Sequence, residues 1–217
     1  MAKRIILRVL LFLGLVVAVL AVNLLIFNIR ASKVSEGTPI NNPDPENAAL
    51  LVIDIQGGTT GNASAINGLK EQSDQFIPRV NAVIEDFHNR DQLIVYIRTE
   101  VVNPLLNVLN NTMAKGSEGA ELDPRLLIEP GPVVVKRRND SFMGTDLDQI
   151  LEDHHIGKVV LVGLDAGQCV KSTVQASINR GYHVAVVDSA VIAKTEELQA
   201  EAMDDFREMG VEIVMPD

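Results

Sequence analysis

Three side chains suited to nucleophilic catalysis, Asp54, Lys136 and Cys169, are spread along this 217-residue chain. Each follows a short apolar run rich in Val, Ile and Leu, a pattern typical of a buried parallel strand. The carboxyl ends of parallel strands meet at one edge of a sheet, where ligands bind. If the three strands are neighbours, a thiol nucleophile, a carboxylate base and a cation converge, as thiol hydrolysis requires. Taken singly, Asp54 could simply cap its own loop, and Lys136 could be a solvated charge.

The only cysteine of the chain, Cys169, lies where a strand passes into a helix. Residues 158–164 form the predicted strand, Gly163 and Gly167 bracket a turn, and a helix is expected to about Asn179. The N-terminus of a helix favours an anion, so we expect this thiol to ionise more easily than a free one. The alternative is a buried cysteine that acts as a small hydrophobic residue.

The remaining patterns predict strands and helices in alternation. Strands are expected at 48–53, 93–97, 132–135, 183–187 and 211–214, and helices at 74–90, 103–109, 145–154 (with Thr145 as N-cap) and 194–209. Such alternation predicts an α/β fold, a three-layer, doubly wound and mostly parallel sheet with helices on both faces.

Residues 1–30 are predicted to form an N-terminal membrane anchor. The stretch 9–27 is long enough to cross a bilayer as one helix. A cleaved signal peptide is the alternative, with a possible small-residue site at Val19 and Ala21, but the apolar run continues to Ile29. We therefore expect a single-pass membrane protein. Three basic residues, Lys3, Arg4 and Arg8, lie on the N-terminal side of this stretch, and two, Arg30 and Lys33, follow it. This slight excess favours a cytoplasmic N-terminus and a periplasmic or extracellular domain.

A polar segment rich in Pro, Asn and Ser, residues 31–46, is expected to link the anchor to a domain at 47–217. Residues 1–36 hold five of the 19 basic side chains and one of the 29 acidic ones, so the remainder is strongly acidic. An acidic domain without Trp should not bind nucleic acid. None of the four His residues has metal-ligand spacing, so we expect neither a metal nor another cofactor.

Three segments together resemble the isochorismatase-like cysteine hydrolases. They are LLVIDIQ around Asp54, VVVKRRNDSFMGTDL around Lys136, and VVLVGLDAGQCVKSTVQASINRGYHVAVVDSA around Cys169. The resemblance implies a doubly wound α/β fold and a catalytic triad of these three residues. It also implies a non-proline cis peptide between Leu164 and Asp165, and an oxyanion hole formed by the backbone N–H groups of Asp165 and Cys169.

The resemblance implies an enzyme that cleaves a C–N bond, of amide or ureide type, in a small molecule through a thioester. The segment RTEVVNPLLN lacks the His-containing metal motif of the family's nicotinamidases, which argues against metal-dependent nicotinamide cleavage. Members that hydrolyse the vinyl ether of isochorismate usually lack the cysteine. The substrate pocket is expected to include Gln56, in a loop that departs from the family pattern, and Phe142, which could equally belong to the core.

Two alternatives to the amidohydrolase stay open. One is a catalytically inactive, membrane-tethered interaction or assembly module, suggested by the altered loop after Asp54 and by the anchor. The other is hydrolysis of a vinyl ether of the isochorismate type. Members of the family commonly self-associate, so a homo-oligomer is possible.

Overall fold

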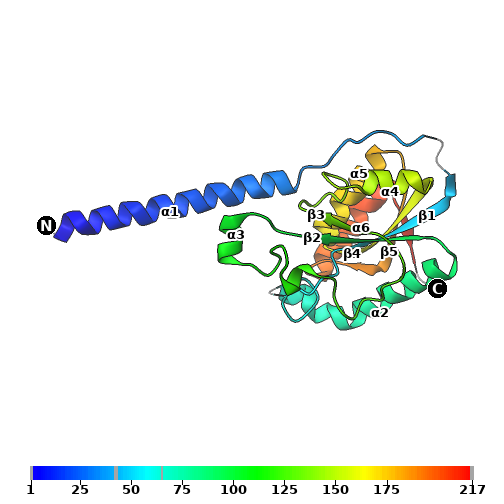
Figure 1. Cartoon of the computed structure of the whole chain (residues 1–217), viewed down its shortest axis with the longest axis horizontal. Helices are drawn as coiled ribbons and strands as arrows, with labels where there is room; N and C mark the ends of the chain where they lie inside the picture. The colour runs from blue at the N-terminus through cyan, green and yellow to red at the C-terminus, as the bar shows by residue number, and fades with distance from the viewer. Residues whose placement is uncertain (1, 42–43, 65, 216–217) are drawn as a thin grey trace.

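The computed structural model describes residues 2–41, 44–64 and 66–215. A long helix, α1 (Ala2–Ala31), projects from a compact α/β domain (Figure 1). The side chains of α1 are exposed over most of its length, and the helix is apolar and long enough to cross a membrane by length and composition. That property alone does not separate an anchor from a signal sequence.

The domain is built on one six-stranded sheet whose described strands are all parallel. In chain order the strands are β1 (Asp44–Ile53), β2 (Leu93–Thr99), β3 (Val133–Lys136), β4 (Ile156–Leu164), β5 (His183–Ile192) and β6 (Glu212–Val214). Their spatial order is β3-β2-β1-β4-β5-β6, so the winding reverses between β1 and β4. In doubly wound sheets the ligand site lies at this switch point, beyond the carboxyl ends of the strands.

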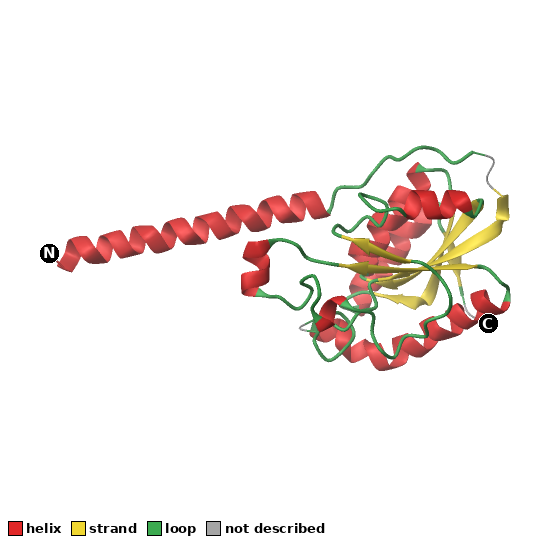
Figure 2. Ribbon diagram, viewed as in Figure 1, coloured by secondary structure: helices red, strands yellow, loops and turns green. Residues whose placement is uncertain are grey.

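Helices cover both faces of the sheet and make the three layers visible in Figure 2. The longer ones are α2 (Asn67–Asn89), α4 (Leu147–Asp153), α5 (Lys171–Asn179) and α6 (Glu196–Glu208). On one face, Leu50 and Val52 of β1 share a core cluster with Phe76 of α2. On the other face, Leu51 of β1 shares a cluster with side chains of α4, α5 and α6. Alternate residues of the strand therefore point to opposite cores, which confirms the predicted α/β fold.

Element boundaries are where the sequence-based prediction was least accurate. β1 begins at Asp44, inside the predicted linker. Its first residues are exposed and join the sheet through the backbone pairing of Asp44 with Ile156, so no buried apolar side chains mark them in the sequence. α2 begins at Asn67, and β5 continues to Ile192. α4 begins only at Leu147, although the Thr145 hydroxyl still accepts a hydrogen bond from the Leu147 N–H at 3.3 Å.

The segment that joins α1 to the domain is held against the domain surface. Ile40 packs on the core, and its N–H donates to the Arg180 carbonyl at 2.9 Å. The Ser35 N–H donates to the Asp140 carboxylate at 2.8 Å. These contacts tie the end of α1 to the domain.

β1 and β4 approach each other closely at Gly163, just before the turn that carries Cys169. Gly163 has a φ of 126°, and any side chain on it would collide with the Ile53 carbonyl oxygen. Only glycine adopts this conformation readily, so Gly163 lets the two central strands meet just before the turn that carries Cys169.

Candidate active site

Asp54 lies at the carboxyl end of β1, at the switch point of the sheet. It is only 4% exposed and has a φ of 56°. This left-handed region is uncommon for non-glycine residues, and Asp is one of the types that enter it most readily. One carboxylate oxygen lies 2.8 Å from the Lys136 ammonium, and the other accepts a hydrogen bond from the Thr99 hydroxyl at 2.9 Å.

Lys136 ends β3 and is fully buried. Because β2 lies between β3 and β1, the long side chain of Lys136 must pass the end of β2 to reach Asp54. The ammonium also donates to the Arg138 carbonyl at 3.0 Å. Burial alone would lower the pKa of Lys136, but the interaction with the Asp54 carboxylate, with a smaller contribution from Cys169, outweighs burial and raises that pKa. Lys136 therefore stays charged in the interior.

Cys169 lies in η2 (Ala166–Val170), a single π-helical turn that leads into α5. Its sulfur is 3.8 Å from Oδ1 of Asn139, and both Asp54 and Lys136 are close enough to shift the pKa of its thiol. Burial, with the Asp54 carboxylate, raises the pKa of the thiol to about 12, and Lys136 offsets this only in part. The expectation that Cys169 would ionise easily is therefore wrong. The cation that could stabilise a thiolate is already paired with Asp54.

A cavity of about 650 Å³ opens over these groups. Asp54, Thr99 and Cys169 form part of its lining, together with Asn139 and Asp165. The last turn of α1 and the residue after it also contribute, through Phe27, Asn28, Ile29, Ala31 and Ser32. The structure thus brings the three candidate catalytic residues together and adds a wall from the N-terminal helix.

The turn between β4 and η2 shapes the floor of this cavity. The peptide bond between Leu164 and Asp165 is cis. The Asp165 carboxylate accepts from the Gly167 N–H at 3.0 Å, and the Asp165 carbonyl accepts from the N–H groups of Gln168 and Val170. Burial raises the pKa of Asp165. The oxyanion-hole role of the Asp165 and Cys169 N–H groups stays a prediction.

The two residues predicted to line the substrate pocket lie elsewhere. Phe142 is 3% exposed and belongs to the core, stacked with Tyr182 at 6.2 Å between ring centroids and covered by the Arg180 guanidinium at 4.2 Å. Gln56 is fully buried and its amide bonds to the backbone of Thr99 and Ala120. A polar side chain near a site need not face it, and here backbone groups already use the whole amide of Gln56.

Several lining residues escaped the sequence analysis, among them the polar residues Thr99, Asn139 and Lys194. Thr99 is the last residue of β2, a position like that of Asp54 after β1. The search for polar residues at the carboxyl ends of strands, which indicated the triad, would have indicated Thr99 too. Asn139 lies in a loop without periodicity. Lys194 lies just before α6, where a solvated charge is the ordinary expectation. Only the folded chain places these two at the cavity.

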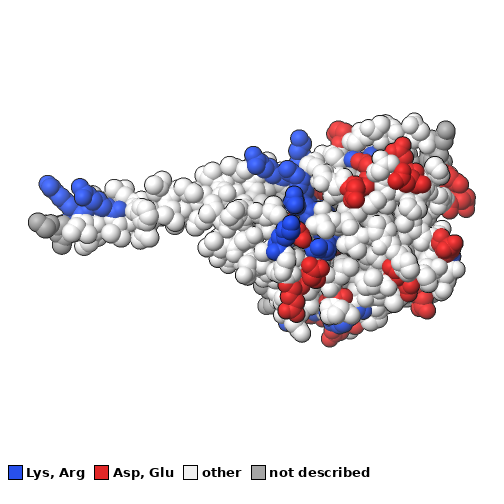
Figure 3. Space-filling view, viewed as in Figure 1, with Lys and Arg blue, Asp and Glu red and all other residues white. Residues whose placement is uncertain are grey.

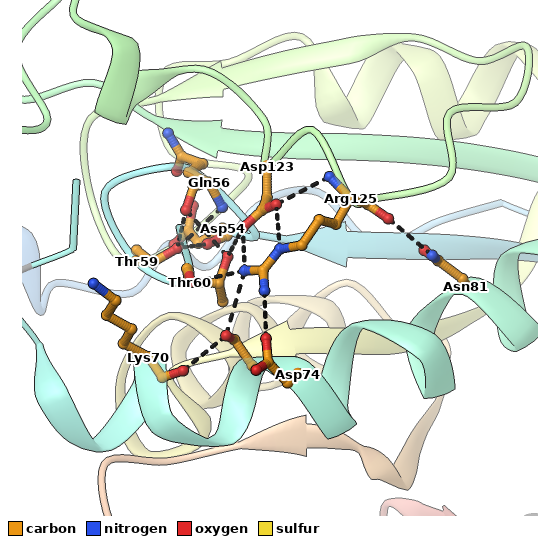
Figure 4. A network of polar contacts seen from close by, with 10 residues as sticks. Asp54, Gln56, Thr59, Thr60, Lys70, Asp74, Asn81, Asp123 and Arg125 are labelled. Atoms are coloured by element: carbon orange, nitrogen blue, oxygen red, sulfur yellow. Dashed lines mark hydrogen bonds and ion pairs between the residues drawn. The ribbon is translucent and has the colours of Figure 1, made fainter. Parts of the chain in front are cut away.

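The loop after Asp54 is fastened by a polar network to the segment before β3 (Figure 4). The Thr59 hydroxyl bonds to the Asp54 carbonyl at 2.7 Å. The Thr60 hydroxyl lies 2.7 Å from the Asp123 carboxylate, which also pairs with Arg125 at 2.8 Å. Gly57 and Gly58 donate from their backbone to Glu121 and Gly119. These contacts hold the unusual loop in place, with Asp54 at its start.

Among the described residues, no group of three or more His, Cys, Asp or Glu side chains is placed to hold a metal ion. His88 pairs with Glu129, and His154 contacts the Ile150 carbonyl, both away from the cavity. The candidate site therefore offers a thiol, a carboxylate and an ammonium, the groups needed for nucleophilic attack on a carbonyl.

The domain matches proteins of one family. The isochorismatase domain model matches residues 48–215. A relative from Arabidopsis thaliana, named as a probable inactive nicotinamidase, is 28% identical over 189 residues, covering 76% of this chain and 90% of its own. N-carbamoylsarcosine amidase from Thermoplasma acidophilum is 26% identical with a TM-score of 0.67, covering 78% of this chain and 96% of its own. Pyrazinamidase from Pyrococcus horikoshii, solved in complex with zinc, is 25% identical with a TM-score of 0.67, covering 78% of this chain and 99% of its own.

The family match spans most of the chain and includes the ends of β1, β3 and β4. The solved amidases share the fold over almost their whole length. The chain therefore belongs to the isochorismatase domain family of hydrolases.

Proposed function

We propose that this protein is a cysteine hydrolase that cleaves a C–N bond, of amide or ureide type, in a small molecule through a thioester. The observation that carries the proposal is the buried Asp54–Lys136 pair, 2.8 Å apart, whose carboxylate lines the same cavity as the only thiol of the chain. Burying two charges is costly, so a core would gain little from this pair by itself. Beside a thiol, the pair supplies a base and a fixed positive charge.

The proposed reaction begins from a neutral thiol. Asp54 takes the thiol proton as the sulfur attacks the carbonyl carbon, and Lys136 stabilises the charge that develops on the sulfur. The N–H groups of Asp165 and Cys169 would bind the oxyanion, each for about 3 kcal/mol. Asp54 then returns the proton to the departing nitrogen, which leaves a thioester. Water, deprotonated by Asp54, attacks that thioester and releases the acid and the thiol.

C–N cleavage is supported by two solved relatives that are named as amidases. One of them was solved with zinc, whereas the described residues of this chain hold no cluster suited to a metal. We therefore favour the metal-independent reaction. The small molecule itself is not specified by the triad, since the triad contacts only the bond that is cleaved.

A non-catalytic module is the second candidate, favoured by the relative that is named as inactive. A buried carboxylate–lysine pair beside a thiol has no evident purpose in such a module. Vinyl-ether hydrolysis of the isochorismate type is the third candidate, and it would not need Cys169.

We also propose that α1 is an uncleaved single-pass anchor that holds the domain on the periplasmic or extracellular side. Its support is the apolar length of α1 and its continuity with the bound segment 32–41. A homo-oligomer stays a prediction. A reporter that is active only in the cytoplasm can be fused to the C-terminus. Activity of that reporter would contradict the proposed orientation.

The test is a screen of the full chain, purified in mild detergent, against primary amides, ureides and N-carbamoyl compounds. We expect ammonia or amine release from at least one class, with an acyl adduct on Cys169 in the intact-mass spectrum. Cys169→Ala should abolish both signals while the circular dichroism is unchanged. Full turnover by Cys169→Ala would exclude covalent catalysis, and a folded protein that is inactive across the panel would favour the module.

A further inference from the structure

The short helix α3 (Pro104–Leu109) lies beside the apolar part of α1. The Asn103 side-chain amide, at the N-cap of α3, donates to the Asn23 side-chain carbonyl at 2.9 Å. Asn23 interrupts the apolar run of α1 and lies seven residues before Arg30, about 10 Å along the helix. A polar side chain within a membrane needs a partner, and here the domain supplies it. The contact also places α3 level with the apolar surface of α1 and not beyond its end.

The surface of α3 is apolar and has no protein covering it. No described residue of α3 is buried, and the exposed fractions are 47% for Val102, 39% for Leu105, 84% for Val108 and 66% for Leu109. Scattered exposed apolar residues are common, but four within eight positions beside an exposed apolar helix form one continuous surface. Figure 1 shows α3 at the tip of its loop, on the side of the domain from which α1 projects.

A band of basic side chains borders this apolar surface. Arg30, Arg137 and Arg138 line one cavity of about 530 Å³ with residues of α1 and the start of the α3 segment. Figure 3 shows basic side chains gathered at the junction between α1 and the domain. On a domain this acidic, basic residues at the border of an apolar surface fit the level of anionic lipid headgroups.

We propose that residues 102–109 insert into the membrane surface beside α1, with Arg30, Arg137 and Arg138 at the level of anionic headgroups. The occupant is a lipid bilayer, because the apolar surface of α3 continues that of a helix long enough to span one. The wall of the catalytic cavity includes the last turn of α1, so its mouth would open at the bilayer surface. This inference rests on the proposed anchor and is independent of the proposed chemistry.

The test uses single tryptophans in the full chain, which has none of its own. Val108→Trp is reconstituted in vesicles of phosphatidylcholine and phosphatidylglycerol whose acyl chains are brominated. Ile26→Trp, on an exposed position of α1, reports insertion of the anchor, and Leu198→Trp, on an exposed position of α6, reports the solvated domain. We expect bromine to quench the first two and to leave the emission of Leu198→Trp unchanged.

Quenching of Ile26→Trp without quenching of Val108→Trp would overturn the inference, and so would quenching of neither. Blue-shifted but unquenched emission from Val108→Trp would mean that protein covers α3, which also overturns it. Adding Arg137→Gln to Val108→Trp should reduce the increase in quenching that phosphatidylglycerol causes. The matched change Arg90→Gln, at the C-cap of the far helix α2, should not. None of these readouts requires turnover, so an inactive protein would leave this inference standing.

Discussion

Two buried carboxylates, Asp54 and Asp123, each pair with a cation at 2.8 Å, yet the proposed reaction uses only Asp54. Asp54 is 4% exposed and Asp123 is 1% exposed. Both lie on the network in Figure 4, Asp54 at the start of the loop after β1 and Asp123 on the segment that fastens that loop. Burial and charge pairing alone therefore do not distinguish the proposed catalytic carboxylate from a structural one.

The surroundings of Asp123 saturate it. Arg125 contacts the carboxylate through its backbone N–H, Nε and Nη2, and the Thr60 hydroxyl adds a fourth contact. Burial would raise the pKa of Asp123, but these hydrogen bonds outweigh it and lower that pKa. Asp123 is thus held ionised, with no reactive group beside it.

Asp54 keeps fewer partners and a different neighbour. Lys136 and the Thr99 hydroxyl each contact one of its oxygens, and Asp54 lines the same cavity as the Cys169 thiol. The thiol and carboxylate share one proton in the proposed reaction. The comparison teaches that a proton-transfer group needs a partner that can give up a proton, and Asp123 has none.

Turnover should separate the two carboxylates most strongly. Asp54→Asn removes the base and should lower kcat/KM by about 10²–10⁴-fold, the usual range for general acid–base catalysis. Asp123→Asn keeps the shape of the side chain and should leave kcat/KM within about threefold, because the residue touches no reacting atom. Steady-state assays on the substrate found in the screen measure both. Equal losses in the two folded variants would break the comparison.

Loss of Lys136 should destabilise the fold more than loss of Arg125, the cation that pairs with Asp123. Lys136→Met leaves Asp54 charged and buried, and should lower the free energy of unfolding by about 3–5 kcal/mol. The Arg125 side chain is 41% exposed, so water can take its place in Arg125→Met. That variant should lose only about 1–3 kcal/mol, the cost of hydrogen bonds to a charged group.

Urea unfolding of the full chain in mild detergent measures both losses. The double variant Asp54→Asn/Lys136→Met, in which both charges are absent, should recover part of the stability that Lys136→Met loses. No recovery would show that the loss comes from packing and not from an uncompensated charge.

The alkylation rate of Cys169 should also distinguish Asp54 from Asp123, by a smaller difference. The pKa of Cys169 is raised to about 12, so alkylation by iodoacetamide should be slow at pH 7 and rise about tenfold per pH unit up to pH 10. Burial is the larger cause of the raised pKa and the Asp54 carboxylate is the next. Asp54→Asn removes that second cause and frees Lys136 to pair with a thiolate. Its alkylation at pH 7 should therefore be faster than in the wild type, even though its turnover is lost.

Asp123→Asn is the matched control and should alkylate as the wild type does. The pH dependence of the alkylation rate, followed by mass spectrometry, decides between these outcomes. A thiol in Asp54→Asn that reacts no faster than the wild type would show that burial, and not the carboxylate, holds the proton.

Much of this molecule could be predicted from sequence because its strands are buried on both faces. A parallel strand such as β4 is a nearly continuous apolar run, which a scan of the sequence detects. The ends of β1, β3 and β4 then indicated Asp54, Lys136 and Cys169, since polar residues at strand ends are conspicuous after apolar runs. The start of β1 was missed because backbone pairing, which leaves no side-chain pattern, extends it.

The sequence by itself determined the alternation of elements, the apolar helix and the types of the three reactive groups, because each depends on residues close together in the chain. The tertiary structure decided that Gln56 and Phe142 turn away from the cavity, that α1 forms part of its wall, and that the Cys169 thiol holds its proton. These properties depend on which distant groups share a space. The ionisation of a thiol follows the sum of its burial and of the charges around it, and that sum exists only once the chain is folded.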